Sequence, residues 1–501
     1  MNPSTASRSV SNSTATPVPG CAPVTGGPYW LAEGETVSFG VTCAGASPVS
    51  ADQLSLEPLP PGASWDAATA TFTWTPGLDQ ASVWNLTVRV AATGEAAPVK
   101  IGVADAYDAP GNVPVVDPLL YTEEYGLPVF FLSPKPTNTS DYQPTTVTHG
   151  GRIYSDAEGK RRGVTSIHYP KSNYTLKFTR ENKFQEPSQL FVNKRKLVLL
   201  GNFDDNSYLR PRLAFDVWNA MDPGHIQVNS YSAVVYANGE YLGLYTVVDM
   251  IDGHLMEDHG YDQDGDLFKA ITAEADFTLT LGTAMTPKNS PHQGYVKKEG
   301  YPVYGQPGAW AKMDDLVRFV AESDDATFRS EVGTRLDMRD YQDWWVFVTL
   351  ILANDSTAKN SYHYHSTAGP WRYIPWDFNA SFGQNWKTTR MIPRDDISFD
   401  YRNRLFKRML AAPAIKGAID QRYAEVLTER VPKATVLGWI DAYAAEIEPS
   451  ARRDERKWSA TYRSWPNFST RTDFTTWEQE VDYLRSWVDR RWDYQEARFP
   501  H

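Results

Sequence analysis

Apolar and polar positions change their spacing along the chain, and the change divides it into two regions. Over residues 22–108, short alternating runs such as "TVSFGVTC" and "WNLTVRVAA" lie between Gly, Pro and Asp turns. Turns spaced about 8 to 12 residues apart are typical of a β-sandwich. From residue 119 onward, strand patterns mix with longer helical ones. We therefore expect an α+β protein: an all-β sandwich followed by a larger mixed domain over residues 119–501.

The first region also resembles a known module. Its "LPPG" (59–62) and "FTWTP" (72–76) are similar to motifs of the putative-Ig repeats of bacterial surface proteins. The resemblance implies an Ig-like spacer or adhesive domain without catalytic residues. The segment "ADAYDAPGNVPVVDP" (104–118) is rich in Pro, Gly and Asp and is predicted to be the linker.

Individual elements of the second region can be predicted from spacing. "NYTLKF" (173–178) alternates as a strand, and "SYLRPRLAFDVWNAM" (207–221) has the spacing of a buried helix face. Asn238-Gly239 predicts a hairpin turn. Residues 272–308 show no period, which favours an insertion or mobile loop. Two helices are expected in "AWAKMDDLVRFVAES" and "DYQDWWVFVTLILAN", and the second would end just before Asp355.

Composition narrows the classes of protein. The 501 residues are 41% hydrophobic, enough for packed cores, and carry a net charge of −12, which argues against a nucleic-acid partner. No apolar run reaches the roughly 18 residues of a transmembrane helix. Residues 1–21 are rich in Ser, Thr and Pro and are expected to form a disordered tether. Cys21 and Cys43 are consistent with one disulfide in an extracytoplasmic module or with two unpaired thiols.

Candidate chemistry centres on residues 352–383. Asp355 and Asn360 have the D-x4-N spacing, "SYHYH" and "WRYIPW" can pair as a hairpin, and Asp377-Phe378 follows. Protein kinases place a catalytic Asp, a metal-binding Asn and a metal-binding Asp in this order. Asp355, Asn360 and Asp377, in this order and around a hairpin, therefore predict an enzyme that transfers phosphoryl groups. The alternative is that Asp355 caps a helix end and Asp377 lies in an ordinary turn.

Upstream segments follow the same order as a kinase N-terminal lobe. Lys177 ends a predicted strand, Asp216 lies on the following helix, and the Asn238-Gly239 hairpin leads to "VVDMID". No G-x-G-x-x-G motif precedes Lys177. The Gly-rich loop that covers the ATP phosphates in typical protein kinases would therefore have to be replaced by a different segment.

With these blocks in view, the chain resembles the CotH (spore coat protein H) kinase family. The likeness is carried by "RRGVTSIHYPKSNYTLKF", "LLGNFDDNSYLRPRLAFDVWNAM", "NGEYLGLYTVVDMIDGHLMEDHGYDQDGDLFKA", "LANDSTAKNSYHYH" and "YIPWDFNASFG". It implies a divergent, two-lobed protein-kinase-like fold that uses ATP with Mg²⁺ or Mn²⁺ to phosphorylate Ser/Thr of extracytoplasmic proteins. In the same resemblance Asp355 is the catalytic acid, Asp377 and Asn360 are metal ligands, and the nucleotide contacts are Lys177, Arg162, Lys171, Asp249 and Lys269.

The chain departs from the family pattern at two places. Asp249 stands in a block that usually has Glu, and "VTSIHY" replaces a Ser-rich run after Arg162-Gly163. Two alternatives to a kinase stay open: transfer of AMP at the same site, and a non-catalytic surface or coat scaffold. The expected location is extracytoplasmic (cell envelope, secreted or spore surface). Substrate and oligomeric state do not follow from the sequence.

Two further patterns have ordinary structural explanations. His363 and His365 alternate on a predicted strand, but no third metal ligand is evident, which favours a polar strand face. "DQDGD" (262–266) resembles the start of a calcium loop but lacks its final Glu, which favours a solvated turn.

Overall fold

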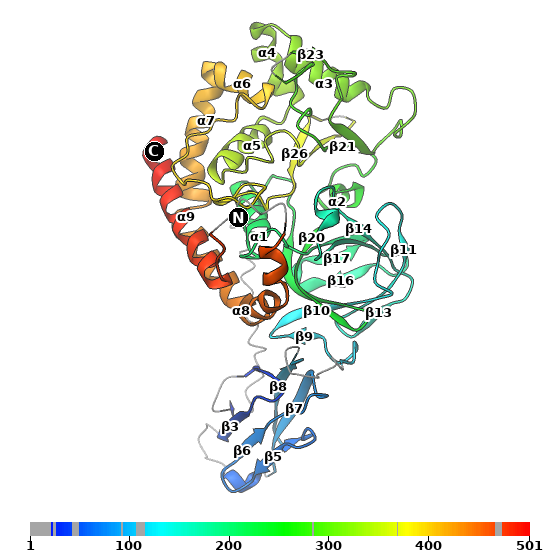
Figure 1. Ribbon diagram of the computed structural model, residues 1–501, viewed down its shortest axis with the longest axis vertical. Coiled ribbons are helices and arrows are strands. Elements are labelled where there is room, and N and C mark those ends of the chain that lie inside the picture. Colours follow the sequence, from blue (N-terminus) through cyan, green and yellow to red (C-terminus); the bar gives the residue numbers. More distant parts are fainter. Residues whose placement is uncertain are drawn as a thin grey trace.

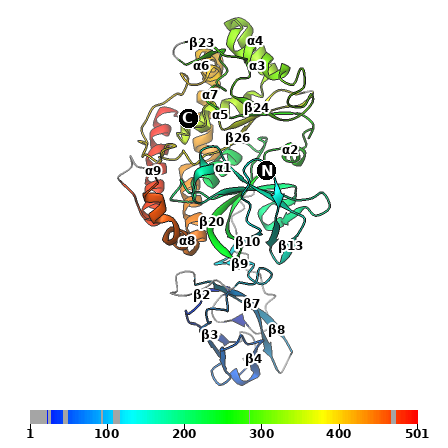
Figure 2. The ribbon, with the colours of Figure 1, turned by 45° about the vertical axis from the view of Figure 1, so that its right-hand side comes forward.

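The computed structural model describes residues 22–23, 27–42, 50–91, 94–106, 116–282, 285–367, 369–465 and 473–500. Both cysteines and the expected tether lie outside these residues. The described part stacks in three tiers along its long axis: an all-β tier, a large sheet, and a mainly helical tier (Figure 1). Two long helices, α8 and α9, run along one side of the upper tiers, as the turned view also shows (Figure 2).

The first tier consists of two facing sheets with strand orders β1-β3-β6-β5 and β2-β8-β7-β4. Phe39, Phe72 and Trp74 of one sheet share a core with Leu56, Val88 and Ile101 of the other. The predicted N-terminal β-sheets are thus confirmed, and the Ig-like type stays a prediction. The strands are β1 Ala22–Pro23, β2 Tyr29–Ala32, β3 Val37–Thr42, β4 Leu54–Glu57, β5 Ser64–Asp66, β6 Thr71–Trp74, β7 Ser82–Val90 and β8 Ala96–Ala104, with a 3-10 turn at Ala51–Gln53.

The second tier is one large sheet of order β11-β14-β15-β18-β20-β19-β10-β12-β13, to which β9 is added beside β10. Its pairs are antiparallel except β10 with β19. The strands are β9 Glu123–Glu124, β10 Leu127–Ser133, β11 Gln143–Pro144, β12 Thr146–His149, β13 Arg152–Tyr154, β14 Glu158–Arg162, β15 Asn173–Lys177, β18 Lys196–Leu200, β19 Ser230–Ala237 and β20 Glu240–Asp249, with β16 Phe184–Glu186 and β17 Phe191–Lys194 as a separate ribbon.

Each face of this sheet has its own core. Leu176, Leu197 and Val247 alternate onto the face covered by β16 and β17. Val198 and Val248 point to the opposite face and pack with α1 (Arg210–Met221) and the helical tier. The predicted helix is thereby confirmed, with Pro211 in its first turn, where a missing N–H costs nothing. The cluster that contains α1 is continuous into the helical tier, so these two tiers share one core.

The third tier combines helices with a small sheet of order β24-β21-β25-β26. The remaining elements are α2 Gly253–Asp258, β21 Asp266–Ala270, β22 Thr280–Leu281, β23 Thr286–Pro287, β24 Tyr295–Glu299, α3 Ala311–Glu322, α4 Asp325–Arg335, α5 Met338–Leu350, β25 Ser361–His365, β26 Arg372–Pro375, α6 Arg404–Ala411, α7 Pro413–Glu425, α8 Lys433–Arg463 and α9 Trp477–Arg498; short turns of other helix types lie at Ser166–His168, Pro187–Gln189 and Val426–Arg430.

Residues 272–308, expected to be an insertion or a mobile loop, contain three short strands among the residues that the structure describes. Strand β24 pairs along β21, and Phe277 and Tyr295 are buried in the main core. The segment lacks a period because its few core side chains come from a turn (Phe277) and a short strand (Tyr295) rather than from one regular element.

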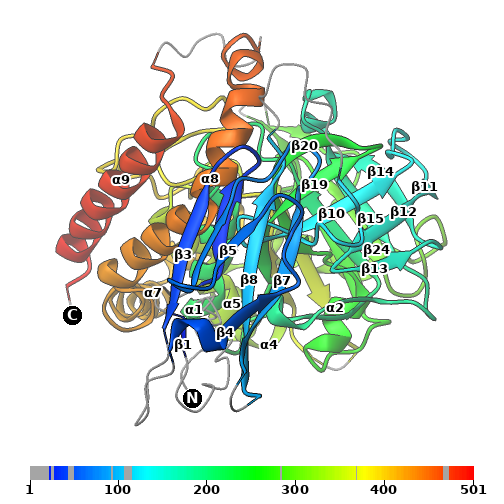
Figure 3. The same ribbon diagram turned by 90° about the horizontal axis from the view of Figure 1, so that it is seen from below.

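Buried charge ties the first tier to the others. Arg453 of α8 forms ion pairs with Asp105, which follows β8, and with Glu124 of β9 at 2.6 Å. On the periphery Lys100 pairs with Glu123 at 2.6 Å. Seen from below, the strands of the first tier lie in front, with α8 on one side of them and most strands of the large sheet on the other (Figure 3). None of the described helices is long and apolar enough to span a bilayer.

Candidate functional site

The segment after α5 forms a compact loop that brings Asp355 and Asn360 together. Helix α5 ends at Leu350, just before this loop, as predicted. Asn360 Nδ2 donates a 3.0 Å hydrogen bond to Asp355 Oδ2, and Lys359 Nζ lies 3.0 Å from Asp355 Oδ1. The Asn360 backbone N–H donates to Ala270 O of β21 at 3.0 Å, which anchors the loop to the small sheet.

The predicted hairpin is confirmed and returns the chain to this loop. Strands β25 and β26 pair antiparallel, with Ser361 opposite Pro375. Asp377 therefore lies beside the start of the loop, where its backbone carbonyl accepts a 3.2 Å hydrogen bond from Ser356 Oγ. Asn360 and Asp377 have φ of 58° and 67°, a left-handed conformation that Asn and Asp adopt more readily than other residues with a Cβ.

Two cations from distant strands converge on the residue before Asp377. The Arg162 guanidinium at the end of β14 lies 4.9 Å from the centre of the Trp376 ring, and Lys269 Nζ of β21 lies 5.6 Å from it. Lys269 Nζ also lies 5.3 Å from the Tyr362 ring. Among the described residues neither cation forms an ion pair with a carboxylate. Half-buried cations without anionic partners suit an anionic ligand such as a triphosphate.

Sequence reasoning missed several residues of this group. Asp204, in the loop before α1, accepts a 2.6 Å hydrogen bond from Asn379 Nδ2. Lys298 of β24 is close enough to Lys269, Lys160 and Arg162 for their charges to act on it. The pair "DD" at 204–205 was visible in a block resembling the family, but spacing alone did not separate their roles. Lys298 was hidden inside the segment expected to be a loop.

The electrostatics of the site follow from burial and from charge crowding. Burial raises the pKa of Asp355, and the negative charge of Asp377 raises it further. Burial, with the charge of Asp377, raises the pKa of Asp204 to about 7. Burial lowers the pKa of Lys269 to about 8, and the positive charge of Arg162 acts in the same direction. The pKa shifts of Asp204 and Lys269 belong to charges that form no ion pair among the described residues, whereas burial outweighs the Lys359 ion pair at Asp355.

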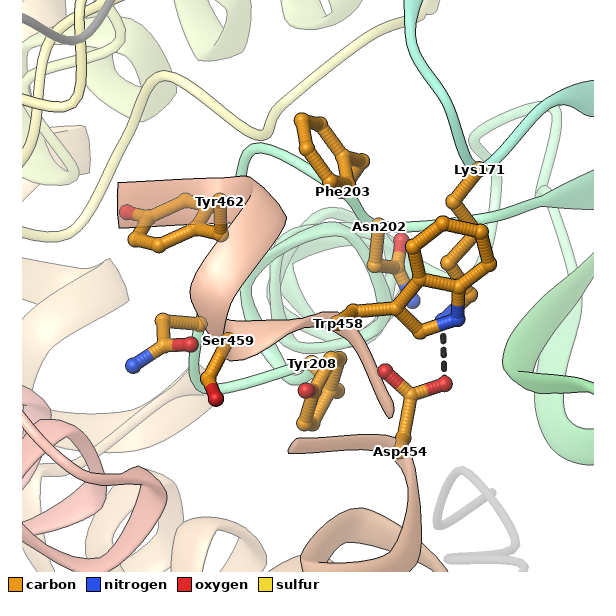
Figure 4. A pocket seen from close by; sticks show the side chains of 9 residues that line it. Lys171, Asn202, Phe203, Tyr208, Asp454, Trp458, Ser459 and Tyr462 are labelled. Carbon is orange, nitrogen blue, oxygen red and sulfur yellow. Dashed lines mark hydrogen bonds and ion pairs between the residues drawn. The ribbon is translucent and has the colours of Figure 1, made fainter. Parts of the chain in front are cut away.

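Three of the predicted nucleotide contacts have their charged groups occupied elsewhere. Lys177 Nζ pairs with Glu158 at 2.7 Å in a partly exposed position. Lys171 Nζ is buried and pairs with Asp454 of α8 at 2.5 Å (Figure 4). Asp249 Oδ1 pairs with Lys194 at 2.9 Å. Asp249 lies opposite Leu197, so its side chain is on the other face of the sheet from that of Arg162.

Two other candidates are structural. Asp216 of α1 accepts a 2.6 Å hydrogen bond from the Tyr443 hydroxyl of α8 and does not pair with Lys177. His363 is buried among aromatic rings and bonds the Tyr341 hydroxyl at 2.9 Å. Burial lowers its pKa to about 3, so the ring is neutral. We expected His363 to lie on a polar face of the strand. The structure instead buries it, because α5 covers that side of β25.

The oxygen donors around Asp377 fit a divalent cation that binds together with a nucleotide. Mg²⁺ is commonly held by one or two carboxylates plus substrate phosphates, and it requires oxygen ligands. Asp377 and Asn360 can supply such oxygens, and Asn360 Oδ1 accepts no hydrogen bond from the residues that the structure describes. No group of three or more His, Cys, Asp or Glu side chains that could hold a metal occurs in this part of the chain. The donor set is therefore incomplete until phosphate oxygens join it.

Comparison with known proteins identifies the family of the chain. The family model described as CotH kinase protein matches residues 160–495, which include every residue of the site named above. The chain is also 24% identical over 334 residues to inner spore coat protein H of Bacillus subtilis (strain 168), an alignment that covers 66% of this chain and 84% of the relative. The chain therefore belongs to the CotH kinase family.

Proposed function

We propose that the protein is an ATP-dependent protein kinase that transfers the γ-phosphoryl group to Ser or Thr hydroxyls with the help of Mg²⁺ or Mn²⁺. Membership of a kinase family supports the reaction class. The observation that supports the proposal is that Asp355, Asn360 and Asp377 lie near Arg162 and Lys269, two cations that form no ion pair within the described residues. An acid for the acceptor hydroxyl, oxygen ligands for a cation, and positive charge for phosphates are the parts that phosphoryl transfer requires.

In the proposed reaction, Asp355 orients the acceptor hydroxyl and takes its proton. The hydroxyl oxygen forms a bond to the γ-phosphorus while the bond from that phosphorus to the β,γ-bridging oxygen breaks, and ADP leaves. Asn360 holds Asp355 in position through their 3.0 Å hydrogen bond. Arg162 and Lys269 bind the phosphates, and Asp377 and Asn360 would hold the divalent cation. When bound, that cation supplies charge neutralisation between the phosphates.

The substrate class is proposed from the relative. Its name, inner spore coat protein H, places that protein in a spore coat. By analogy we propose that this chain phosphorylates proteins of the cell envelope or spore surface. The N-terminal sandwich, if Ig-like as predicted, would act as a spacer or adhesive domain that holds the catalytic part near such proteins.

The experiment uses ATP labelled at the γ- or the α-phosphate, with Mn²⁺ and either a mixture of envelope and coat proteins or casein as acceptor. The proposal predicts label transfer from γ-ATP only, with phosphoserine or phosphothreonine in the product. Transfer from α-ATP would instead mean AMP transfer. Absence of any label together with absence of an ATP-induced thermal shift would mean a scaffold, and either outcome contradicts the proposal.

A further inference from the structure

We propose that Asp204 is a second carboxylate ligand of the divalent cation, acting with Asp377 from the opposite side of the site. The inference rests on the proposed function, because it names a residue of the same site. Asp204 precedes α1 on the large-sheet side of the site, whereas Asp377 follows β26 of the small sheet. The cation would thus join the large-sheet tier to the helical tier.

The two adjacent acids at 204 and 205 have different environments. Asp205 is fully buried and satisfied: it pairs with Arg210 at 2.6 Å and accepts bonds from the backbone N–H groups of Ser207 and Arg210. Its role is to start α1. The Asp204 carboxylate has neutral donors instead, the Asn379 amide at 2.6 Å and the Tyr169 hydroxyl. No Lys or Arg within the described part of the chain forms an ion pair with it.

Hydrogen bonds hold Asp204 and the Asp377 segment together. The Gln384 side-chain amide donates to Asp204 O at 2.9 Å and to Asn379 O at 2.7 Å. Gln384 is buried, so this bridge fixes the backbone of both segments. Asp377 is close enough for its negative charge to act on Asp204. Within the described residues neither carboxylate forms an ion pair with a Lys or Arg side chain. Asp377 is exposed and Asp204 is half-buried, so a divalent cation that needs oxygen ligands can reach both from solvent.

The alternative is that Asp204 only fastens the loop through Asn379. An Asn side chain can accept the same hydrogen bond through its own oxygen, so Asp204→Asn preserves the fastening and removes the charge. The substitution therefore separates the two roles. Asp79 provides a matched control, since it is an exposed Asp in the sandwich, and Asp79→Asn removes the same charge far from the site.

The test measures Mn²⁺ binding by the full chain, from the electron paramagnetic resonance signal of free Mn²⁺, with and without a non-hydrolysable ATP analogue. We expect Asp204→Asn to weaken Mn²⁺ binding at least about tenfold in the presence of the analogue, since one of two charged ligands is lost. Asp79→Asn should bind like the wild type. Circular dichroism and the unfolding midpoint without metal should show that Asp204→Asn is folded.

Other outcomes distinguish the inference from the proposed function. If Asp377→Asn abolishes Mn²⁺ binding while Asp204→Asn binds like the wild type, the role of Asp204 is wrong and the kinase proposal stands. If the wild type binds no Mn²⁺ even with the analogue, both fail. Should Asp204→Asn not fold, anomalous scattering from Mn²⁺ in wild-type crystals with the analogue decides the question. An ion coordinated by Asp204 supports the inference, and an ion coordinated by Asp377 but not by Asp204 overturns it.

Discussion

Asn360 Nδ2 and Asp355 Oδ2 lie 3.0 Å apart, so the two residues of the D-x4-N spacing touch through their side chains. The bond occupies the nitrogen of the Asn360 amide and orients one oxygen of the Asp355 carboxylate. It therefore couples the position of the proposed catalytic acid to that of a proposed metal ligand. Asp377 takes no part in this bond, so the roles of Asp355 and Asp377 can be tested by separate mutations.

Asp355→Asn should lower kcat by about 10² to 10⁴ while leaving ATP affinity nearly unchanged, because a general base acts on the acceptor hydroxyl and not on the nucleotide. The substituted Asn keeps the shape of the side chain, and its amide oxygen can still accept the hydrogen bond from Asn360 Nδ2. Rates of γ-phosphoryl transfer and the ATP–Mn²⁺ thermal shift measure the two quantities. If the thermal shift disappears with the activity, the division of roles is wrong.

Asp377→Ala should abolish both transfer and metal-dependent nucleotide binding, because it removes the principal charged ligand of the cation. Calorimetric titration of ATP with Mn²⁺ and with EDTA tests this, with Asp79→Ala in the sandwich as the control. Affinity that still depends on Mn²⁺ in the Asp377 variant would show that the cation is held elsewhere.

ATP affinity should depend on pH through Lys269. Burial lowers its pKa to about 8 in the free protein, so its ammonium is charged below that pH and neutral above it. Affinity for ATP is expected to fall about tenfold between about pH 7 and pH 9.5, the effect of losing one nearby charge. Lys269→Arg stays charged throughout this range and should remove the dependence. An unchanged pH profile in Lys269→Arg would exclude Lys269 from phosphate binding.

Lys171→Met should destabilise the fold rather than weaken nucleotide binding. Its ion pair with Asp454 joins the large sheet to α8, and the side chains of both partners are 1% exposed. Leaving a buried carboxylate unpaired costs about 3–5 kcal/mol in the free energy of unfolding. Lys177→Met, which breaks a pair about one-third exposed, should cost about 0–1 kcal/mol.

Chemical denaturation of Lys171→Met and Lys177→Met measures the loss in the free energy of unfolding. ATP titration of the folded variants tests whether either lysine contacts the nucleotide. If Lys171→Met is as stable as the wild type but binds ATP at least tenfold more weakly, Lys171 is a nucleotide contact as the family resemblance implied.

The parts of the site that sequence could predict are local. The end of α5, the β25–β26 hairpin and the return of Asp377 follow from helical spacing and from alternation within a few tens of residues. The partner of Lys171 could not be predicted, because Asp454 is 283 positions away and reaches it only through packing of α8 against the sheet. Asp204 was overlooked for the same reason: its relation to Asp377 is a product of tertiary structure.

The central claim is that one site holds a cation and a triphosphate between Asp377 and the pair Arg162 and Lys269. Crystals of the protein with Mn²⁺ and a non-hydrolysable ATP analogue test it most directly. The account predicts phosphates in contact with Arg162 and Lys269, Mn²⁺ on Asp377, and the γ-phosphate facing Asp355. A nucleotide bound elsewhere, for instance beside Lys177 and Glu158, would contradict it.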